Sequence, residues 1–152
     1  MDDPRYSYRQ LSVLDIALLR ELNVVFGEAF NEKDTYQDNV PTDAYLTSVL
    51  NKSHVIALTA MHGNKVVGGL VAYELEKFEQ MRREIYIYDL AVAEQYRRKG
   101  TATELINTLK TIAKERGAYV IYVQADQDDT PAIELYRSLG KEEDVLHFDI
   151  PV

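Results

Sequence analysis

The stretch from Glu84 to Ala125 constrains the fold most, because two strand patterns flank one helical pattern. The strand patterns are "EIYIYDLAV" and "AYVIYVQA", both rich in β-branched and aromatic residues. Between them, "TATELINTLKTIAKERG" repeats apolar residues at helical spacing, and Gly117 is placed to end the helix. A strand–helix–strand unit joins parallel strands through a crossover. The second strand pattern is apolar on both faces, as expected of a central strand.

The rest of the sequence predicts further strands and helices around this unit. Ser12 is the expected cap of a helix whose apolar stripe includes Leu14, and Thr42 the expected cap of a second helix. Thr101 and Glu104 have the spacing of a capping box. The other expected elements are strands over 6–12, 54–61, 65–75 and 145–150, a polar loop over 27–41, and a helix over 130–140 capped by Thr130.

Hairpin-linked strands early in the chain and helix-linked strands later predict a mixed α/β sheet flanked by helices, antiparallel at one end and parallel at the crossover. No Pro/Gly/Ser-rich linker divides the 152 residues. We therefore expect one domain over 1–152.

Composition excludes several classes of function. The chain has no cysteine, which excludes disulfides, thiolate metal sites and a cysteine nucleophile. His54, His62 and His147 are scattered without metal-ligand spacing, so we expect no metal. A net charge of -8 argues against nucleic-acid binding and suits a cationic small ligand. The start of the chain has no apolar signal region and no run spans a membrane, so we expect a soluble, cytoplasmic protein without a membrane partner.

Three cations lie directly before the predicted helix, in "RRKGTA" from Arg97 to Ala102. A helix N-terminus carries partial positive charge and normally attracts acidic residues. Free first-turn amides, the helix dipole and these cations together make an anion site, and Gly100 lets the backbone approach the anion. A solvated basic turn is the alternative. The missing Gly-Lys-Ser/Thr ending argues against a phosphate-hydrolysing P-loop.

Asp89 interrupts the strand before this turn. In a regular strand Ile85 and Ile87 share its face, while Tyr86 and Tyr88 lie on the other. One interpretation is an aspartate that caps a turn at the strand end. The other is a local bulge that splays the strand from its neighbour and frees backbone groups to bind an extended, amide-containing ligand.

These motifs resemble the GNAT superfamily of acetyl-coenzyme A N-acetyltransferases. "RRKGTA" fits the family pattern Arg/Gln-x-x-Gly-x-Gly/Ala, with Ala102 where many members have Gly, and "PAIELYRSLG" is similar to a second signature. "KFEQMRREIYIYDLAV", "GAYVIYVQAD" and "HFDI" resemble gentamicin-type aminoglycoside 3-N-acetyltransferases, from about Val55 onward. The resemblance implies the GNAT fold, with acetyl-CoA as co-substrate. It implies a pyrophosphate site at Arg97, Arg98, Lys99, Gly100, Thr101 and Ala102, and a pantetheine site at Leu90, Ala91 and Val92, where Leu90 and Val92 pair through their backbone.

The resemblance also implies roles in catalysis. Tyr136 is the expected acid that protonates the leaving thiolate; the alternative is a ring that only packs. Asp126, Asp128 and Asp129 follow the second strand, at the sheet edge where ligands gather. Asp126 is the candidate for a catalytic carboxylate, although a water chain could serve as base. The candidates for binding the substrate's ammonium groups are Asp126, Asp129, Glu84 and Asp149, and the alternative for Asp129 is a cap of the following helix. Glu28, Glu32, Asp34 and Asp38 could extend that surface; the alternative is a solvated, mobile loop.

The expected function is therefore acetylation of an aminoglycoside amine, which would give aminoglycoside resistance. The 3-amine of deoxystreptamine and a homodimer are implied by the resemblance alone. The alternatives are an enzyme of the same fold that acetylates a polyamine or a protein amine, and a non-catalytic acyl-CoA binding module.

Overall fold

A computed structural model describes residues 3–152. The chain divides into two compact units, the first ending at Tyr122 and the second covering Val123–Val152. A single domain over the whole chain stays a prediction. No helix within residues 3–152 is both long and apolar enough to cross a membrane.

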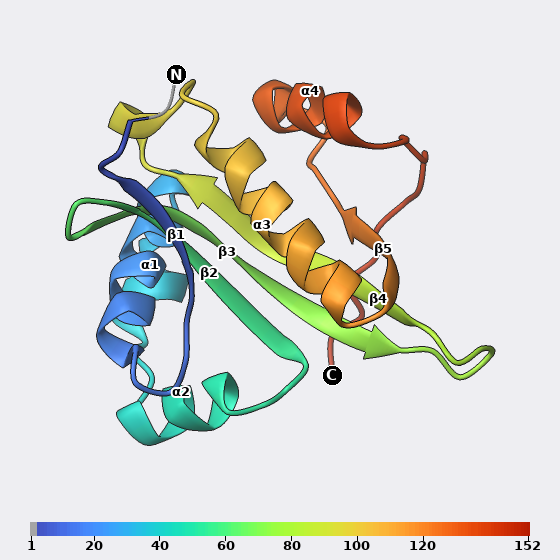
Figure 1. Cartoon of the computed structure of the whole chain (residues 1–152), viewed down its shortest axis with the longest axis horizontal. Helices are drawn as coiled ribbons and strands as arrows, with labels where there is room; N and C mark the ends of the chain where they lie inside the picture. The colour runs from blue at the N-terminus through green and yellow to red at the C-terminus, as the bar shows by residue number, and fades with distance from the viewer. Residues whose placement is uncertain (1–2) are drawn as a thin grey trace. The chain divides into compact units, whose positions relative to one another are not determined.

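A five-stranded mixed sheet organises the chain (Figure 1). Its spatial order is the chain order: β1 (Tyr6–Gln10), β2 (Val55–His62), β3 (Lys65–Glu76), β4 (Arg83–Val92) and β5 (Ala118–Val123). The first four strands pair antiparallel with their neighbours. A helical crossover then brings β5 alongside β4 in parallel (Figure 1). This confirms the mixed sheet expected from the sequence.

The sequence prediction was wrong at the far edge of this sheet. β5 ends the strand order rather than lying in its centre. The strand expected over 145–150 does not form, and residues 141–152 have no helix or strand. An alternating apolar pattern makes a strand only where a partner strand accepts its backbone hydrogen bonds.

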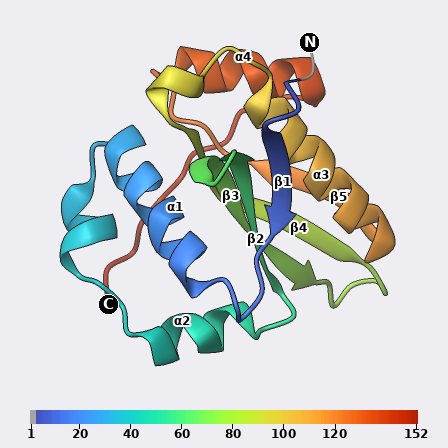
Figure 2. The same cartoon turned by 60° about the vertical axis from the view of Figure 1, so that its left-hand side comes forward.

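Helices cover both faces of the sheet. α1 (Ile16–Ala29) and α2 (Asp43–Leu50) lie on one face, and α3 (Thr101–Glu115) lies on the other (Figure 2). A π-helical turn, η1 (Asp34–Asp38), connects α1 to α2, and a short 3-10 turn, η2 (Glu94–Tyr96), lies between β4 and α3. A further helix, α4 (Thr130–Leu139), follows β5 in the chain. The segment expected to be only polar loop therefore contains the end of α1 and the η1 turn.

The core is apolar on both faces, which fixes the sheet between the helices. Leu22 and Phe26 of α1 form one buried cluster with strand residues that include Ala57 and Ala91. On α3, Leu105 and Leu109 are completely buried. Each such side chain contributes about 1.5–3 kcal/mol relative to leaving it exposed.

The start of α1 differs from the prediction. The helix begins at Ile16 rather than after Ser12, and Leu14 is 89% exposed outside it. The reason is Asp15, whose carboxylate accepts the Ser12 amide at 2.8 Å and an Arg9 guanidinium nitrogen at 2.6 Å. These bonds hold the segment in a turn before the helix can start.

Two further caps are shifted by one residue. Gly100 is the N-cap of α3, so the capping box expected for Thr101 and Glu104 does not form; the Thr101 side chain is buried instead. Asp129 rather than Thr130 caps α4, because its carboxylate accepts the Ala132 amide at 3.3 Å. The cap expected at Thr42 is confirmed: its hydroxyl accepts the Tyr45 amide at 3.1 Å.

Candidate functional site

The β4 strand contains a β-bulge at the position where the sequence suggested one. Val71 of β3 pairs with Asp89, but the next residue, Ala72, pairs with Ile87. Tyr88 is therefore the extra residue on β4. A bulge disrupts the ladder locally and redirects the side chains that follow it.

The bulge carries Asp89 across the sheet. Two residues beyond it, Ala91 belongs to the core cluster of α1, and Asp89 itself contacts Tyr36 of η1 on that same side. Ile85 and Ile87 are buried outside this cluster. The prediction that Asp89 shares a face with Ile85 and Ile87 was therefore wrong, because the inserted Tyr88 breaks the alternation of the strand.

Asp89 lies half-buried under an aromatic surface. The Tyr36 hydroxyl is 3.1 Å from each of its two carboxylate oxygens and donates to them. Tyr73 and Tyr86 contact Tyr88 edge-on, with ring centroids 6.1 and 5.9 Å apart, and Tyr86 stacks on Tyr122 at 4.7 Å. Burial raises the pKa of Asp89 above its ordinary value, the Tyr36 hydrogen bond opposes this, and the charge of Glu32 adds to it.

Asp89 has no cation of its own. Within residues 3–152, no Lys, Arg or His forms an ion pair with it. A partly buried carboxylate without a positive partner is costly in the free protein. Burial is the main cause of its raised pKa, and an ammonium group beside it would offset that cost.

The turn between β4 and α3 has the geometry of an anion cradle. Gly100 adopts φ +80°, in the left-handed region, and Arg98 adopts φ 62°. A Cβ added at Gly100 would meet no atom within 4 Å, so the space beside this backbone is open. No side chain caps the first amides of α3, which leaves them to face a ligand. The residues present therefore fit a pyrophosphate.

The three cations of this turn are not equivalent. Arg97 donates from Nε to the Val92 carbonyl at 2.9 Å, which fixes the end of β4 against the turn. Arg98 and Lys99 are exposed and form no ion pair within the described part of the chain. Those two side chains are free to neutralise a bound anion.

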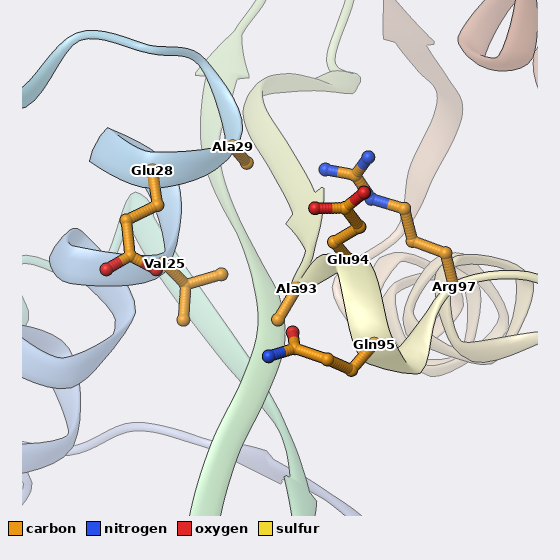
Figure 3. Close-up of a pocket in the computed structure, with 7 residues that line it drawn as sticks. All are labelled: Val25, Glu28, Ala29, Ala93, Glu94, Gln95 and Arg97. Atoms are coloured by element: carbon orange, nitrogen blue, oxygen red, sulfur yellow. The ribbon is translucent and has the colours of Figure 1, made fainter.

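A cavity of about 200 Å³ opens beside this turn, between the end of α1 and η2. Figure 3 shows Arg97 and Glu94 on one side of it and residues of α1 on the other. Its lining residues are Val25, Glu28, Ala29, Ala93, Glu94, Gln95 and Arg97. Glu28, expected on the acidic surface, thus lines a space next to the basic turn.

Tyr136, Asp126, Asp129 and Asp149 all belong to the second unit. Burial raises the pKa of Tyr136 to about 12, with a further contribution from the charge of Asp129. The phenol therefore stays protonated near neutral pH and can donate a proton. Asp129 caps α4 and Asp126 is exposed in the turn before it, where its carbonyl accepts the Asp129 amide at 3.0 Å. Asp149 is exposed and lies 2.9 Å from the His147 ring.

Glu84 is already engaged at the start of β4. Lys77 lies 3.6 Å from its carboxylate, and the Tyr119 hydroxyl also bonds to it. This site is therefore partly neutralised, unlike that of Asp89.

The sequence indicated Asp89 only as the position of a possible bulge or turn cap, and it did not reveal Tyr36 as the partner of Asp89. Tyr36 is distant in the chain and lies in a polar segment without periodicity. The one sequence signal was a carboxylate among apolar and aromatic residues of a strand. A residue that meets it through tertiary structure leaves no local pattern.

Two solved structures are similar to this chain over nearly its whole length. An aminoglycoside acetyltransferase from an uncultured soil metagenomic sample is 54% identical, with a TM-score of 0.95 over 97% of this chain and 98% of that chain. A second aminoglycoside acetyltransferase from such a sample, in complex with sisomicin, is 31% identical, with a TM-score of 0.92 over 99% and 98%.

The curated relatives match only part of this chain. An N-alpha-acetyltransferase of Saccharolobus solfataricus is 31% identical over 53% of this chain and 53% of its own length. The chain spans about half the length, or less, of the curated relatives that it matches. A model of the Acetyltransferase (GNAT) family, in contrast, matches residues 17–141. This match covers the bulged strand, the basic turn and α4, and the chain therefore belongs to the acetyltransferase (GNAT) family.

Proposed function

We propose that this protein transfers the acetyl group of acetyl-CoA, the co-substrate of its family, to an amine of an aminoglycoside. The observation that carries the proposal is Asp89, a half-buried carboxylate under an aromatic surface and without a cation within residues 3–152. An aminoglycoside carries several ammonium groups, and one of them would supply the positive charge that Asp89 lacks. Similarity to two aminoglycoside acetyltransferases over nearly the whole chain supports the same substrate class.

The basic turn provides the co-substrate site in this proposal. The α3 amides, Gly100, Thr101 and Ala102, together with Arg97, Arg98 and Lys99, hold the pyrophosphate, and backbone groups of Leu90, Ala91 and Val92 bind the pantetheine amides. Ala93, the residue after β4, donates its amide to Val67 at 2.7 Å, which keeps the end of the strand in the sheet. The cofactor carries the activated thioester, and the protein supplies orientation and proton handling.

The chemistry is a direct attack by the amine nitrogen on the thioester carbonyl. A C–N bond forms and the C–S bond breaks, while the nitrogen gives its proton to a general base and the sulfur takes one from a general acid. Asp89 is the carboxylate that we propose to attract the ammonium form of the acceptor. Asp126 is the proposed catalytic carboxylate, which takes the proton directly or through a water chain. Tyr136, with its pKa of about 12, is the proposed donor to the thiolate.

The acidic residues proposed to contribute to substrate binding also include Asp129, Glu84 and Asp149, and their contributions are not equal. One carboxylate oxygen of Asp129 accepts a hydrogen bond from the Ala132 amide, and Glu84 forms an ion pair with Lys77. Their remaining capacity is electrostatic, because a polycation responds to the summed charge of the surface. Acetylation at the 3-amine and resistance in a host cell are the finer parts of this proposal.

A protein α-amine is the second candidate acceptor. Two N-alpha-acetyltransferases are 31% and 32% identical to parts of the chain. A peptide N-terminus presents one positive charge to the acidic surface, whereas an aminoglycoside presents several.

Release of coenzyme A thiol, measured with acetyl-CoA and a panel of acceptors, separates these functions. Gentamicin and sisomicin should support turnover, and spermidine and a peptide should not. NMR of the product would locate the acetyl group on the 3-amine, and expression in a susceptible bacterium should raise the inhibitory drug concentration. Binding of acetyl-CoA in calorimetry without thiol release with any amine would instead identify a non-catalytic binding module.

A further inference from the structure

We propose that Tyr36 is a positioning residue that keeps the Asp89 carboxylate ionised and fixed beside the acceptor amine. This inference rests on the proposed function, which it deepens. It also assigns a role to Tyr36 in the acidic segment around η1, from which the sequence suggested only carboxylates that extend the substrate surface.

The geometry of the contact is two-sided. The Tyr36 hydroxyl lies 3.1 Å from both Oδ1 and Oδ2 of Asp89, so it faces the carboxylate along its axis. A donor in this position resists rotation of the carboxylate in either direction. The outer lone pairs of both oxygens remain available for an ammonium group.

The Tyr36 ring is itself held in place. It packs against Phe26 and Phe30 of the α1 segment, with ring centroids 5.9 and 5.8 Å away, and Phe26 is only 1% exposed. The Tyr36 amide donates to the Glu32 carbonyl at 3.2 Å, where the π-helical turn begins. The hydroxyl therefore reaches the β4 bulge from a rigid support.

The groups around Asp89 divide into one that favours its charge and several that do not. Tyr36 donates to it, while Glu32 repels it; the phenols of Tyr73 and Tyr86 also interact with its charge. Burial, and then the negative charge of Asp89, raise the pKa of Tyr36 above its ordinary value, so that it remains a donor. Without the Tyr36 hydroxyl, burial and Glu32 act unopposed and the pKa of Asp89 rises.

The first test is direct titration of Asp89 by carboxyl-carbon NMR in the parent and in Tyr36→Phe. The pKa of Asp89 should rise in the variant, while the melting temperature shows that the fold is retained. Tyr6→Phe is the matched control, since this partly buried tyrosine of β1 loses the same hydroxyl beside His62 and does not contribute to the pKa of Asp89. Its Asp89 titration should equal that of the parent.

The second test is the dependence of kcat/KM on pH with gentamicin. Tyr36→Phe should reduce kcat/KM by about 10- to 100-fold at acidic pH, the range of a hydrogen bond to a charged group. The ratio to the parent should recover as pH rises and Asp89 ionises. In an Asp89→Asn background, Tyr36→Phe should have little additional effect, because the two residues act as one unit.

These measurements separate the two proposals. An unchanged Asp89 titration in a folded, active Tyr36→Phe variant overturns the role of Tyr36 and leaves the proposed function intact. A shifted titration in a protein that acetylates no aminoglycoside overturns the proposed function, while the coupling between Tyr36 and Asp89 stands. A full Tyr36→Phe effect in the Asp89→Asn background also overturns the inference.

Discussion

At the scale of single residues, the Asp89 carboxylate is half-buried without a cation, which costs free energy as long as no ligand is bound. Asp89 lies on the aromatic side of β4 only because Tyr88 is inserted before it. Proteins tolerate such local costs at functional sites, where a ligand removes them. Stability and ligand binding should therefore respond to Asp89 in opposite directions.

The stability of Asp89→Asn should depend on pH with a defined sign. Burial raises the folded-state pKa of Asp89, so the native state holds this proton more tightly than the unfolded chain does. The resulting stabilisation is complete below the unfolded value of about 3.9 and is lost as pH rises through the folded value. Asp89→Asn should therefore melt higher than the parent at neutral pH, and this difference should vanish near pH 3. A variant that melts lower than the parent at neutral pH would contradict the assigned sign.

Gly100→Asp tests the anion cradle. The site is open, so the side chain fits, but φ +80° costs about 1–2 kcal/mol for a residue with a Cβ. The new carboxylate should also repel the pyrophosphate, and we expect coenzyme A affinity to fall by about tenfold or more in calorimetry, which corresponds to about 1.4 kcal/mol. Gly100→Ala is the control, because it carries the backbone strain without the charge. Equal coenzyme A affinities of the Ala and Asp variants would show that the pyrophosphate does not bind at this turn.

Tyr136→Phe tests the proposed acid. The ring remains to pack, so stability should change by no more than one hydrogen bond, about 0.5–1.5 kcal/mol. If Tyr136 protonates the thiolate, kcat should fall by about 10²–10⁴-fold with nearly unchanged coenzyme A affinity. Thermal melting and single-turnover kinetics are measured together. A folded variant with parental turnover in the chemical step would show that Tyr136 only packs.

At the scale of elements, local patterns predicted most strands and helices but not their exceptions. The hairpin between β2 and β3 turns at Gly63, and α3 stops before Gly117. Both glycines have positive φ, a conformation that glycine adopts without steric cost. The start of α1 was wrong because Asp15 is bonded by Arg9, a strand residue. An element boundary that depends on a partner from another element has no signature in its own segment.

Gly69 shows how closely two elements approach. A Cβ at this position of β3 would lie 2.4 Å from the Leu58 carbonyl oxygen and 2.5 Å from Leu22 Cδ1. Gly69→Ala should therefore lower the free energy of unfolding by about 1–3 kcal/mol through overpacking, measured by urea denaturation. Gly63→Ala is a useful comparison, since its Cβ would meet nothing within 4 Å and only backbone strain acts. Parental stability of Gly69→Ala would mean that both the Leu22 side chain and the Leu58 backbone can move away from this position without cost.

At the scale of the whole molecule, periodicity and turn residues predicted the mixed sheet, while the site needed tertiary structure. The basic turn was visible because its residues are contiguous, from Arg97 to Ala102. The contact between Tyr36 and Asp89 was not, because it joins two distant segments. The strand expected at 145–150 failed for the same reason: a strand is defined by its partner rather than by its own alternation.

The net charge of -8 makes a final prediction about the whole molecule. An acidic surface attracts a polycationic drug over distances that salt screens, and the Debye length falls from about 30 Å at 0.01 M to about 3 Å at 1 M salt. The KM for gentamicin should therefore rise several-fold across this range, whereas a neutral acceptor amine should show little change. Asp126→Asn should raise the KM at low salt and flatten the salt dependence, with coenzyme A affinity preserved. A KM for gentamicin that is independent of salt would show that the acidic residues do not attract the drug, and would confine recognition to short-range contacts such as those at Asp89.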